Sequence, residues 1–288
     1  MSVSIQPAPS TAETIARLAR PRSGEAPMRT SVRLIARLAY TSFKLRYSSS
    51  ALGYVWSLVR PLALFGMLYL FFVLVLLRGL TSSRVNFPVQ LLVGIVIWTF
   101  FVEATSTATV SVAANADMLH RARFPRWVLV VAAVASAAIT LAVNLTLVAV
   151  LGLVFHWFTI GVQTLWVPVL LLELVALALG LGLLLAAFFV YYRDLGYIWE
   201  IALQFLFYAS AILFPFSLVP AHWQWLVTLN PVAQVTEDLR RALVTDQIPW
   251  SATLLGAKFA LPLVAVALSV VAGWLMFRRL SARFGERL

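Results

Sequence analysis

Six long apolar runs are the feature that most limits what this chain can fold into. Each has close to the ~20 mainly apolar residues that a helix needs to cross the hydrocarbon core of a bilayer. The runs lie at Val59–Leu77, Val89–Val112, Val128–Phe155, Leu165–Tyr191, Ile198–Phe216 and Leu254–Phe277. Inside hydrocarbon a helix satisfies all of its backbone hydrogen bonds within one segment. The sequence therefore predicts an all-α integral membrane protein with six transmembrane helices.

The composition agrees with a membrane protein and excludes several soluble classes. Of the 288 residues, 62% are hydrophobic and 11% are charged, whereas soluble domains are about half apolar and about a quarter charged. Cysteine is absent, which excludes disulfides, thiolate nucleophiles and cysteine metal ligands. The net charge is +11, and the basic residues flank the apolar runs. This placement predicts an anionic membrane surface, not nucleic acid, as the partner of the positive charge.

The polar N-terminal part divides into two regions. Residues 1–28 are rich in serine, proline and alanine, which predicts a disordered tail. Residues 29–57 are basic, and between Thr30 and Leu45 apolar residues recur at helical spacing. This pattern predicts an amphipathic helix in the membrane interface, with a solvated helix as the alternative. Residues 58–288 then form the transmembrane domain.

The segment before the last apolar run, Ser217–Thr253, contains prolines, tryptophans and charged side chains. It is too polar to span a membrane and too aromatic for a simple aqueous loop. We expect short, partly re-entrant helices, which a membrane tolerates only where they pack on protein or line a cavity. Asn230 and Pro231 have the capping and first-turn chemistry that begins a helix, and Glu237 and Arg240 can pair on it at i,i+3 spacing.

The distribution of lysine and arginine predicts the orientation. With both termini inside, 17 of the 22 basic residues are cytoplasmic. The other five are Arg78, Arg84, Arg240, Arg241 and Lys258. Because cytoplasmic loops carry the excess of basic residues, this bias favours a cytoplasmic N-terminus and a cytoplasmic C-terminus.

The acidic and histidine residues form no catalytic or metal-binding pattern. Glu103 and Glu173 lie within predicted spans, and Glu200 lies near the start of another. No two of them share an i,i+3 or i,i+4 spacing, and the three histidines fall in loops. We predict no catalytic residue and no metal site, and we expect these acids to pair within the bundle or to reach an interface.

Three groups of residues occur in order along the chain. The first comprises Lys44-Leu-Arg-Tyr47, Ser50, Leu52-Gly53, Trp56 and Pro61. The second comprises Gly94, Trp98-Thr-Phe-Phe101, Asn115, Leu119 and Arg123-Phe-Pro125. The third comprises Tyr192-Arg-Asp194, Phe207, Pro215, Asn230-Pro231 and Arg240-Arg241. In order and spacing these groups resemble the membrane subunit of ABC-2-type polysaccharide exporters, which move O-antigen, teichoic acid, galactan and related lipid-linked glycans.

The resemblance implies a multi-pass protein of the bacterial cytoplasmic membrane that transports a glycan on a polyprenyl diphosphate. It also implies a homodimer of this subunit bound to two copies of a separate ATPase. The chain has no GxxxxGK[ST] phosphate loop, so ATP and Mg²⁺ are expected on the partner and no cofactor on this chain.

In the family, the interfacial helix and two cytoplasmic loops face the ATPase. The loop residues that this assigns to ATPase coupling here are Asn115, His120, Arg121, Arg123, Phe124, Pro125, Tyr192, Arg193 and Asp194. Pro125 fits the first turn of the third span, since proline lacks a backbone donor. The alternatives are basic residues that only anchor the protein, and an Arg193–Asp194 turn that caps helix ends or forms a surface ion pair.

Two further groups are candidates for contact with the cargo. Aromatic faces stack on sugar rings and polyprenyl chains, and the candidates for the substrate path are Tyr69, Phe72, Trp98 and Phe101. The candidates for an outer gate are Asn230, Pro231, Glu237, Arg240 and Arg241. A plain periplasmic loop with an Asn-Pro turn is the alternative to a gate.

Two other functions compete with export of a lipid-linked polysaccharide. One is an ABC-2 exporter of drugs or small lipids. The other is a membrane glycan transferase or flippase that works without an ATPase. A transferase should act alone on purified donor and acceptor, and a drug exporter should respond to small amphiphiles instead of glycan length.

Overall fold

The computed structural model describes residues 27–48, 53, 55–72, 74, 87–121, 125–158, 161–210, 212–213, 219–244, 248–281 and 284. Within these ranges the chain forms helices and turns and no strand. The predicted tail, up to residue 26, lies outside the described residues, as do Arg123 and Phe124.

The helices follow one another along the chain with short connections. They are α2 (Pro27–Ser48), α3 (Val55–Phe71), α4 (Phe87–Ala114), α5 (Ala116–Arg121), α6 (Trp127–Val154), the 3₁₀ helix η2 (Val162–Trp166), α7 (Val167–Phe189), α8 (Leu195–Ala209), α9 (Ala221–Thr228), α10 (Pro231–Leu243), α11 (Ser251–Leu255), the 3₁₀ helix η4 (Gly256–Phe259) and α12 (Ala260–Ser281). All six predicted apolar runs overlap helices of this set. Parts of the first and fifth runs, residues 73, 75–77, 211 and 214–216, lie outside the described residues.

Four helical segments of the described chain are long and apolar enough to cross a membrane. They are Phe87–Ala114, Trp127–Val154, Val162–Phe189 and Ser251–Ser281. The first and fifth predicted runs overlap the shorter apolar helices α3, with 17 residues, and α8, with 15. The all-helical membrane class is therefore confirmed, and the number of six spans stays a prediction.

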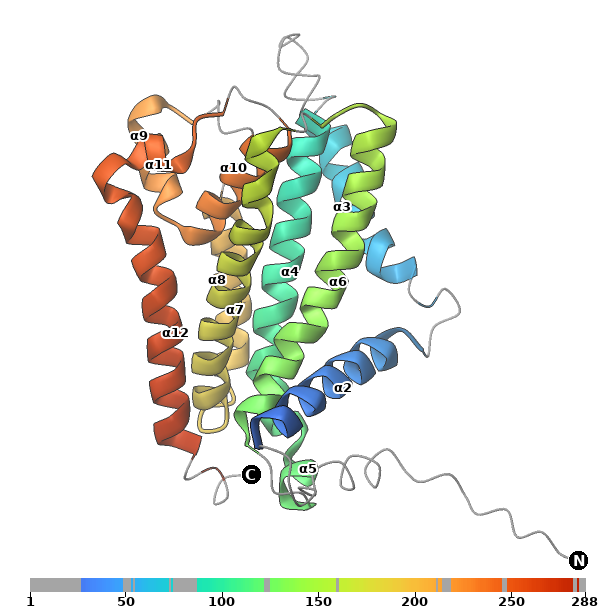
Figure 1. The fold of residues 1–288 in the computed structure, drawn as a ribbon, viewed down its shortest axis with the longest axis vertical. Coiled ribbons are helices and arrows are strands. Elements are labelled where there is room, and N and C mark those ends of the chain that lie inside the picture. The colour runs from blue at the N-terminus through green and yellow to red at the C-terminus, as the bar shows by residue number, and fades with distance from the viewer. Residues whose placement is uncertain are drawn as a thin grey trace, which may run out of the picture.

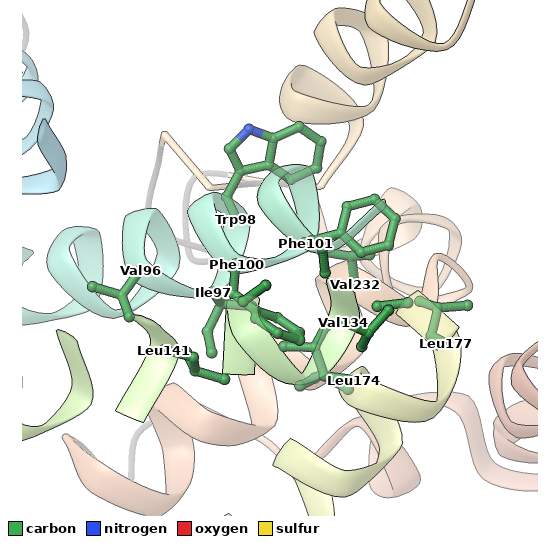
Figure 2. Close-up of a cluster of buried hydrophobic side chains, with 14 of the residues drawn as sticks. Val96, Ile97, Trp98, Phe100, Phe101, Val134, Leu141, Leu174, Leu177 and Val232 are labelled. Atoms are coloured by element: carbon green, nitrogen blue, oxygen red, sulfur yellow. The ribbon is translucent and has the colours of Figure 1, made fainter. Parts of the chain in front are cut away.

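Helix α4 lies at the centre of the bundle (Figure 1), against α6, α7, α3 and α8. Its apolar side chains are buried on all sides, as expected for a helix without a polar face. Figure 2 shows Phe100 and Ile97 of α4 pointing toward Leu141 of α6 and Leu174 of α7. Trp98 extends from the other side of α4, away from this cluster.

The outer helix α12 packs closely along α7 because glycines remove side chains from the contact. A Cβ atom added at Gly273 of α12 would lie 2.2 Å from the backbone oxygen of Gly180 on α7. Small residues allow such close approach of helix backbones in membranes, where packing drives association.

Helix α2 is amphipathic, as its sequence predicts. Leu34 and Leu38 are buried against the first turns of α6, whereas Arg33 and Arg37 are exposed. The helix runs obliquely across the bundle near one end (Figure 1). Its location in the membrane interface stays a prediction.

The two ends of the bundle carry different elements (Figure 1). One end holds α5, the α7–α8 turn and the C-terminal end of α12, and the other holds α9 and α11. The short helices predicted within Ser217–Thr253 are present as α9, α10 and α11. Because Arg126, Arg193 and Arg278 belong to the first of these ends, we call it the basic end; which side of the membrane it faces stays a prediction.

Candidate functional site

Helix α10 begins as its sequence predicts. Asn230 is the N-cap residue, its side-chain oxygen accepts a hydrogen bond from the Val232 N–H at 3.0 Å, and Pro231 occupies the first helical position. The Asn230 amide also donates to the Ser210 hydroxyl oxygen at 2.8 Å, just beyond the last residue of α8. One asparagine therefore both caps α10 and fixes it to the end of α8.

Arg240 is the centre of a buried polar network at this end of the bundle. Its side chain and that of Glu237 are each only 1% exposed, and Arg240 Nη1 donates to Glu237 Oε1 at 2.5 Å. The same guanidinium donates to the backbone oxygens of Gln90 at 2.9 Å and Ile212 at 3.0 Å. The predicted i,i+3 pair is thus present, and it joins α10 to α4 and to the segment after α8.

A glycine on α4 makes room for this arginine. A Cβ atom at Gly94 would lie 2.6 Å from Arg240 Nη2. Of the predicted gate residues, Glu237 and Arg240 are therefore buried in the interior of this chain, and Arg241 is half-buried.

Asp238 attaches α11 to α10. Its carboxylate accepts hydrogen bonds from the Gln234 amide at 3.0 Å and from the Ser251 backbone N–H at 2.8 Å. Burial raises the pKa of the Asp238 carboxyl, and it also raises the pKa of the Glu237 carboxyl despite the neighbouring arginine. The network fixes the fold of the end that holds α9 and α11.

A second polar contact lies within the apolar bundle. Arg46 of α2 donates to the carboxylate of Glu103 on α4, and the Thr140 hydroxyl of α6 donates to the same carboxylate at 3.0 Å. This confirms the expectation that Glu103 pairs within the bundle. Sequence reasoning did not name Arg46 as the partner, although an acid inside an apolar run needs a nearby cation.

A cavity of about 610 Å³ opens between α3, α4 and α8. Its lining combines aromatic and aliphatic side chains with a few polar ones: Leu64, Trp98, Val102, Ser106, Glu200, Leu203, Gln204, Phe207 and Tyr208. A second cavity of about 450 Å³ is also lined by Trp98 and Val102 and includes the Arg46–Glu103 pair in its lining. Such mixed linings are typical of ligand pockets.

The structure separates the four predicted substrate-path aromatics. Trp98 lines both cavities, and its ring centroid is 5.5 Å from that of Phe207 on α8. Phe101 is 1% exposed and packs in the core (Figure 2), while Phe72 is buried against Phe87. Tyr69 is half-buried and stacks on Phe65. Only Trp98 of the four lines either of these cavities. Phe207, Tyr208 and Gln204 also line the first cavity, and the sequence did not predict them for the substrate path.

The first predicted coupling loop begins at the end of α4. The Asn115 amide donates to the Ser111 backbone oxygen at 2.7 Å, and the next residues, including His120 and Arg121, form the short helix α5. Pro125 lies just before α6, which starts at Trp127. The prediction that Pro125 is inside the first turn is wrong by two residues: its backbone oxygen accepts from the Val128 N–H and so starts the turn from outside the helix.

The second predicted coupling loop is a tight turn between α7 and α8. Tyr192 is exposed, and the Arg193 guanidinium lies over the Phe189 ring, 5.3 Å from its centroid. Asp194 occupies the N-cap position of α8, but its side chain makes no capping hydrogen bond. Capping by Asp194 therefore does not account for this turn.

The end of α12 binds both coupling loops. Arg126 donates to the Ser281 backbone oxygen and lies over the Phe284 ring, 5.6 Å from its centroid. The Tyr191 hydroxyl donates to the Leu280 backbone oxygen at 3.1 Å. The two loops are therefore mechanically connected through one helix end, which sequence spacing could not predict.

Within the described residues, no group of three or more histidine, aspartate and glutamate side chains lies close enough to hold a metal ion. Charged side chains such as Arg46 and Arg240 instead bond between helices, whereas several threonines, including Thr105 and Thr109, bond to the backbone of their own helix. The arrangement as a whole is that of a polytopic membrane permease, with a buried central span and a cavity at its side.

Residues 33–244 match the family described as ABC-2 type transporter, and the chain belongs to this family. The O-antigen export system permease protein RfbA of Klebsiella pneumoniae is 26% identical over 256 residues, covering 88% of this chain and 95% of the relative. RfbA of Myxococcus xanthus is 28% identical over 245 residues, covering 84% and 88%. The polysialic acid transport protein KpsM of Escherichia coli is 25% identical over 205 residues, covering 70% and 78%.

These relatives are permeases of polysaccharide export systems, so the predicted resemblance is confirmed. The chain is accordingly a multi-pass protein of the cytoplasmic (inner) membrane.

Proposed function

We propose that this chain is the transmembrane subunit of an ATP-driven exporter that moves a lipid-linked polysaccharide, carried on a polyprenyl diphosphate, across the cytoplasmic membrane. The observation that carries the proposal is the match to O-antigen export permeases over nearly their whole length, together with a cavity suited to sugars. In that cavity Trp98, Phe207 and Tyr208 offer aromatic faces, and Gln204 and Glu200 offer polar groups.

The passage is proposed to lie between two copies of this chain. Helices α3 and α8 border the cavity and expose large apolar side chains, including Met67, Leu70, Tyr197 and Phe205. A second protomer facing these helices would close the open side of the cavity and enclose a path for the glycan.

Coupling to ATP hydrolysis is proposed to occur at the basic end. The loop containing Arg121 and Arg123 and the turn containing Arg193 would contact a separate ATPase, which would bind ATP and Mg²⁺. Because the end of α12 binds both loops, a push on either loop would be shared by the other.

The proposed function is tested by purifying the tagged full-length chain from its native membrane and analysing co-purifying protein and lipid by mass spectrometry. We expect an ATPase with a phosphate loop and a glycan on polyprenyl diphosphate. The pair is then reconstituted into vesicles with that glycan, and ATP-dependent protection of the glycan from an added glycosidase is measured. Protection of the glycan without ATP would favour a flippase, and the appearance of new glycosidic bonds would favour a transferase. Transport of small amphiphiles alone would favour a drug or lipid exporter.

The coupling proposal has its own test. Charge reversal in Arg121→Glu/Arg123→Glu should leave membrane insertion intact, since these charges lie outside the long apolar helices, but should reduce co-purification of the ATPase and export. The matched control is Arg17→Glu/Arg20→Glu, which changes the same charge in the N-terminal region. Normal export by the loop variant would refute the assignment.

The outer gate is proposed to consist of α9–α11 as a unit that Arg240 holds in place. Leu226 lies on the exposed side of α9, so Leu226→Cys in this cysteine-free chain allows one crosslink to the second protomer. Crosslinking should stop export of a long glycan while ATP hydrolysis continues. Export at the uncrosslinked rate would show that the segment is not a gate.

The same cysteine-free background tests the orientation. Tyr192 and Trp223 are exposed and lie at opposite ends of the bundle, so each can be replaced by cysteine. In intact cells an impermeant thiol reagent should label position 223 and leave position 192 unlabelled. The reverse pattern would refute cytoplasmic termini.

A further inference from the structure

A separate cavity of about 360 Å³ lies at the basic end, between the start of α6 and the end of α12. It is lined by Pro125, Arg126, Trp127, Trp274, Phe277, Arg278 and Ser281. The lining holds two arginines and no acidic side chain, and it shares no residue with the cavity of about 610 Å³ beside Trp98. Its charge is complementary to an anion.

The aromatic part of the cavity has the composition of a membrane interface. Trp127 and Trp274 meet edge to face, with ring centroids 6.2 Å apart, and Trp274 remains 40% exposed. Tryptophan at a helix end, next to arginine, is typical of the level of the lipid headgroups. Phe277 closes the floor of the cavity and is buried.

The surface of α12 next to the cavity continues as an apolar stripe. Leu268, Val271 and Leu275 are exposed large apolar side chains. They share a helical face with Trp274 and Arg278, because residues three and four positions apart are neighbours on a helix. Along this face the order is apolar, then aromatic, then positive, which is the order of groups that an anionic phospholipid would meet from its acyl chains to its phosphate.

One of the two arginines has a fixed position. Arg126 is held by the Ser281 backbone oxygen and the Phe284 ring, whereas Arg278 is exposed on the last turns of α12. The cavity thus combines a guanidinium that is already held in place with an exposed one at its rim. Arginine suits phosphate binding because its planar group binds phosphate oxygens in pairs.

We propose that this cavity binds the headgroup of an anionic phospholipid from the leaflet at the basic end, with an acyl chain along the exposed face of α12. The site is independent of the exported cargo. Basic pockets between transmembrane helices bind anionic headgroups in this way, because the charge is attractive and the acyl chains stay in hydrocarbon. The site would fix the end of α12 and, through Ser281 and Leu280, both coupling loops.

The test is native mass spectrometry of the full-length chain during titration with phosphatidylglycerol, with phosphatidylcholine as the zwitterionic comparison. Arg278→Gln should weaken phosphatidylglycerol binding about fivefold, since it removes one positive charge. Arg278→Lys keeps the charge and should retain most of the affinity. Arg279→Gln is the matched control, since Arg279 is exposed next to Arg278 but does not line the cavity. A photoactivatable phosphatidylglycerol should crosslink to the peptide that contains Val271 and Trp274.

Four results would overturn the proposal. Equal binding of phosphatidylglycerol by wild type and Arg278→Gln would show that this cavity is not the lipid-binding site. Equal weakening by Arg278→Gln and Arg279→Gln would indicate a general surface charge. Displacement of the bound lipid by free glycerol phosphate would indicate a site for soluble anions, and displacement by the purified ATPase would indicate a protein contact.

Discussion

Replacing Arg240 with leucine should be among the most damaging single changes in the described part of the chain. The arginine and Glu237 are both 1% exposed, so Arg240→Leu leaves a buried carboxylate without its cation. Breaking a buried ion pair in this way costs about 3–5 kcal/mol. The backbone oxygens of Gln90 and Ile212 also lose their donor, at about 1 kcal/mol each.

A second variant separates the charge from the hydrogen bonds. In Arg240→Leu/Glu237→Leu both members of the ion pair are removed together, and the backbone oxygens of Gln90 and Ile212 still lose their donor. We expect a residual loss of about 2 kcal/mol, so the double variant should be about 3 kcal/mol more stable than the single one. Burial raises the pKa of the Glu237 carboxyl, so the folded single variant binds a proton more readily than the unfolded chain. Its deficit should therefore shrink as the pH is lowered.

The assay is reversible unfolding in mixed micelles of a mild detergent and SDS, followed by far-UV circular dichroism and tryptophan fluorescence. Wild type, Arg240→Leu, Glu237→Leu and the double variant form one thermodynamic cycle. If Arg240→Leu matched the wild type, or if the double variant were no more stable than Arg240→Leu, the network would not hold the helices together as argued.

Two other predictions concern packing and pairing inside the bundle. Gly273→Leu should separate α12 from α7, since even a Cβ atom there would lie 2.2 Å from a backbone oxygen. In the same assay the free energy of unfolding should fall by more than about 2 kcal/mol, in the upper part of the range for overpacked cores. Gly66→Leu, where nothing lies within 4 Å, should be near neutral. Arg46→Glu should lower stability and export, and the charge exchange Arg46→Glu/Glu103→Arg should recover part of both; no recovery would mean that the pair is incidental.

Much of the fold follows from the apolar runs. Their lengths and flanking charges predict the helices, and the chemistry of asparagine followed by proline predicts the start of α10 at its observed residue. The i,i+3 spacing predicts the Glu237–Arg240 pair. These features depend on neighbours in sequence, so local reasoning is sufficient for them.

The partners across the bundle were not predictable in the same way. Arg240 binds the backbone oxygen of Gln90, 150 residues earlier in the chain, and nothing in the sequence near either residue indicates this contact.

The aromatic candidates failed for a related reason. Helix α4 is apolar on all sides, so its periodicity does not show that Trp98 faces a cavity while Phe101 faces the core.

The bond between Asn230 and Ser210 also determines how far α8 can extend. With 15 residues, α8 is about 22 Å long, against about 30 Å for the hydrocarbon of a bilayer. The backbone oxygen of Ile212, two residues beyond Ser210, accepts a hydrogen bond from Arg240, so the chain at this point is bonded to α10 and does not continue α8. Helix α8 therefore covers about three quarters of the hydrocarbon thickness, and at Ser210 the polar bonding of the chain changes from the turns of one helix to contacts with α10.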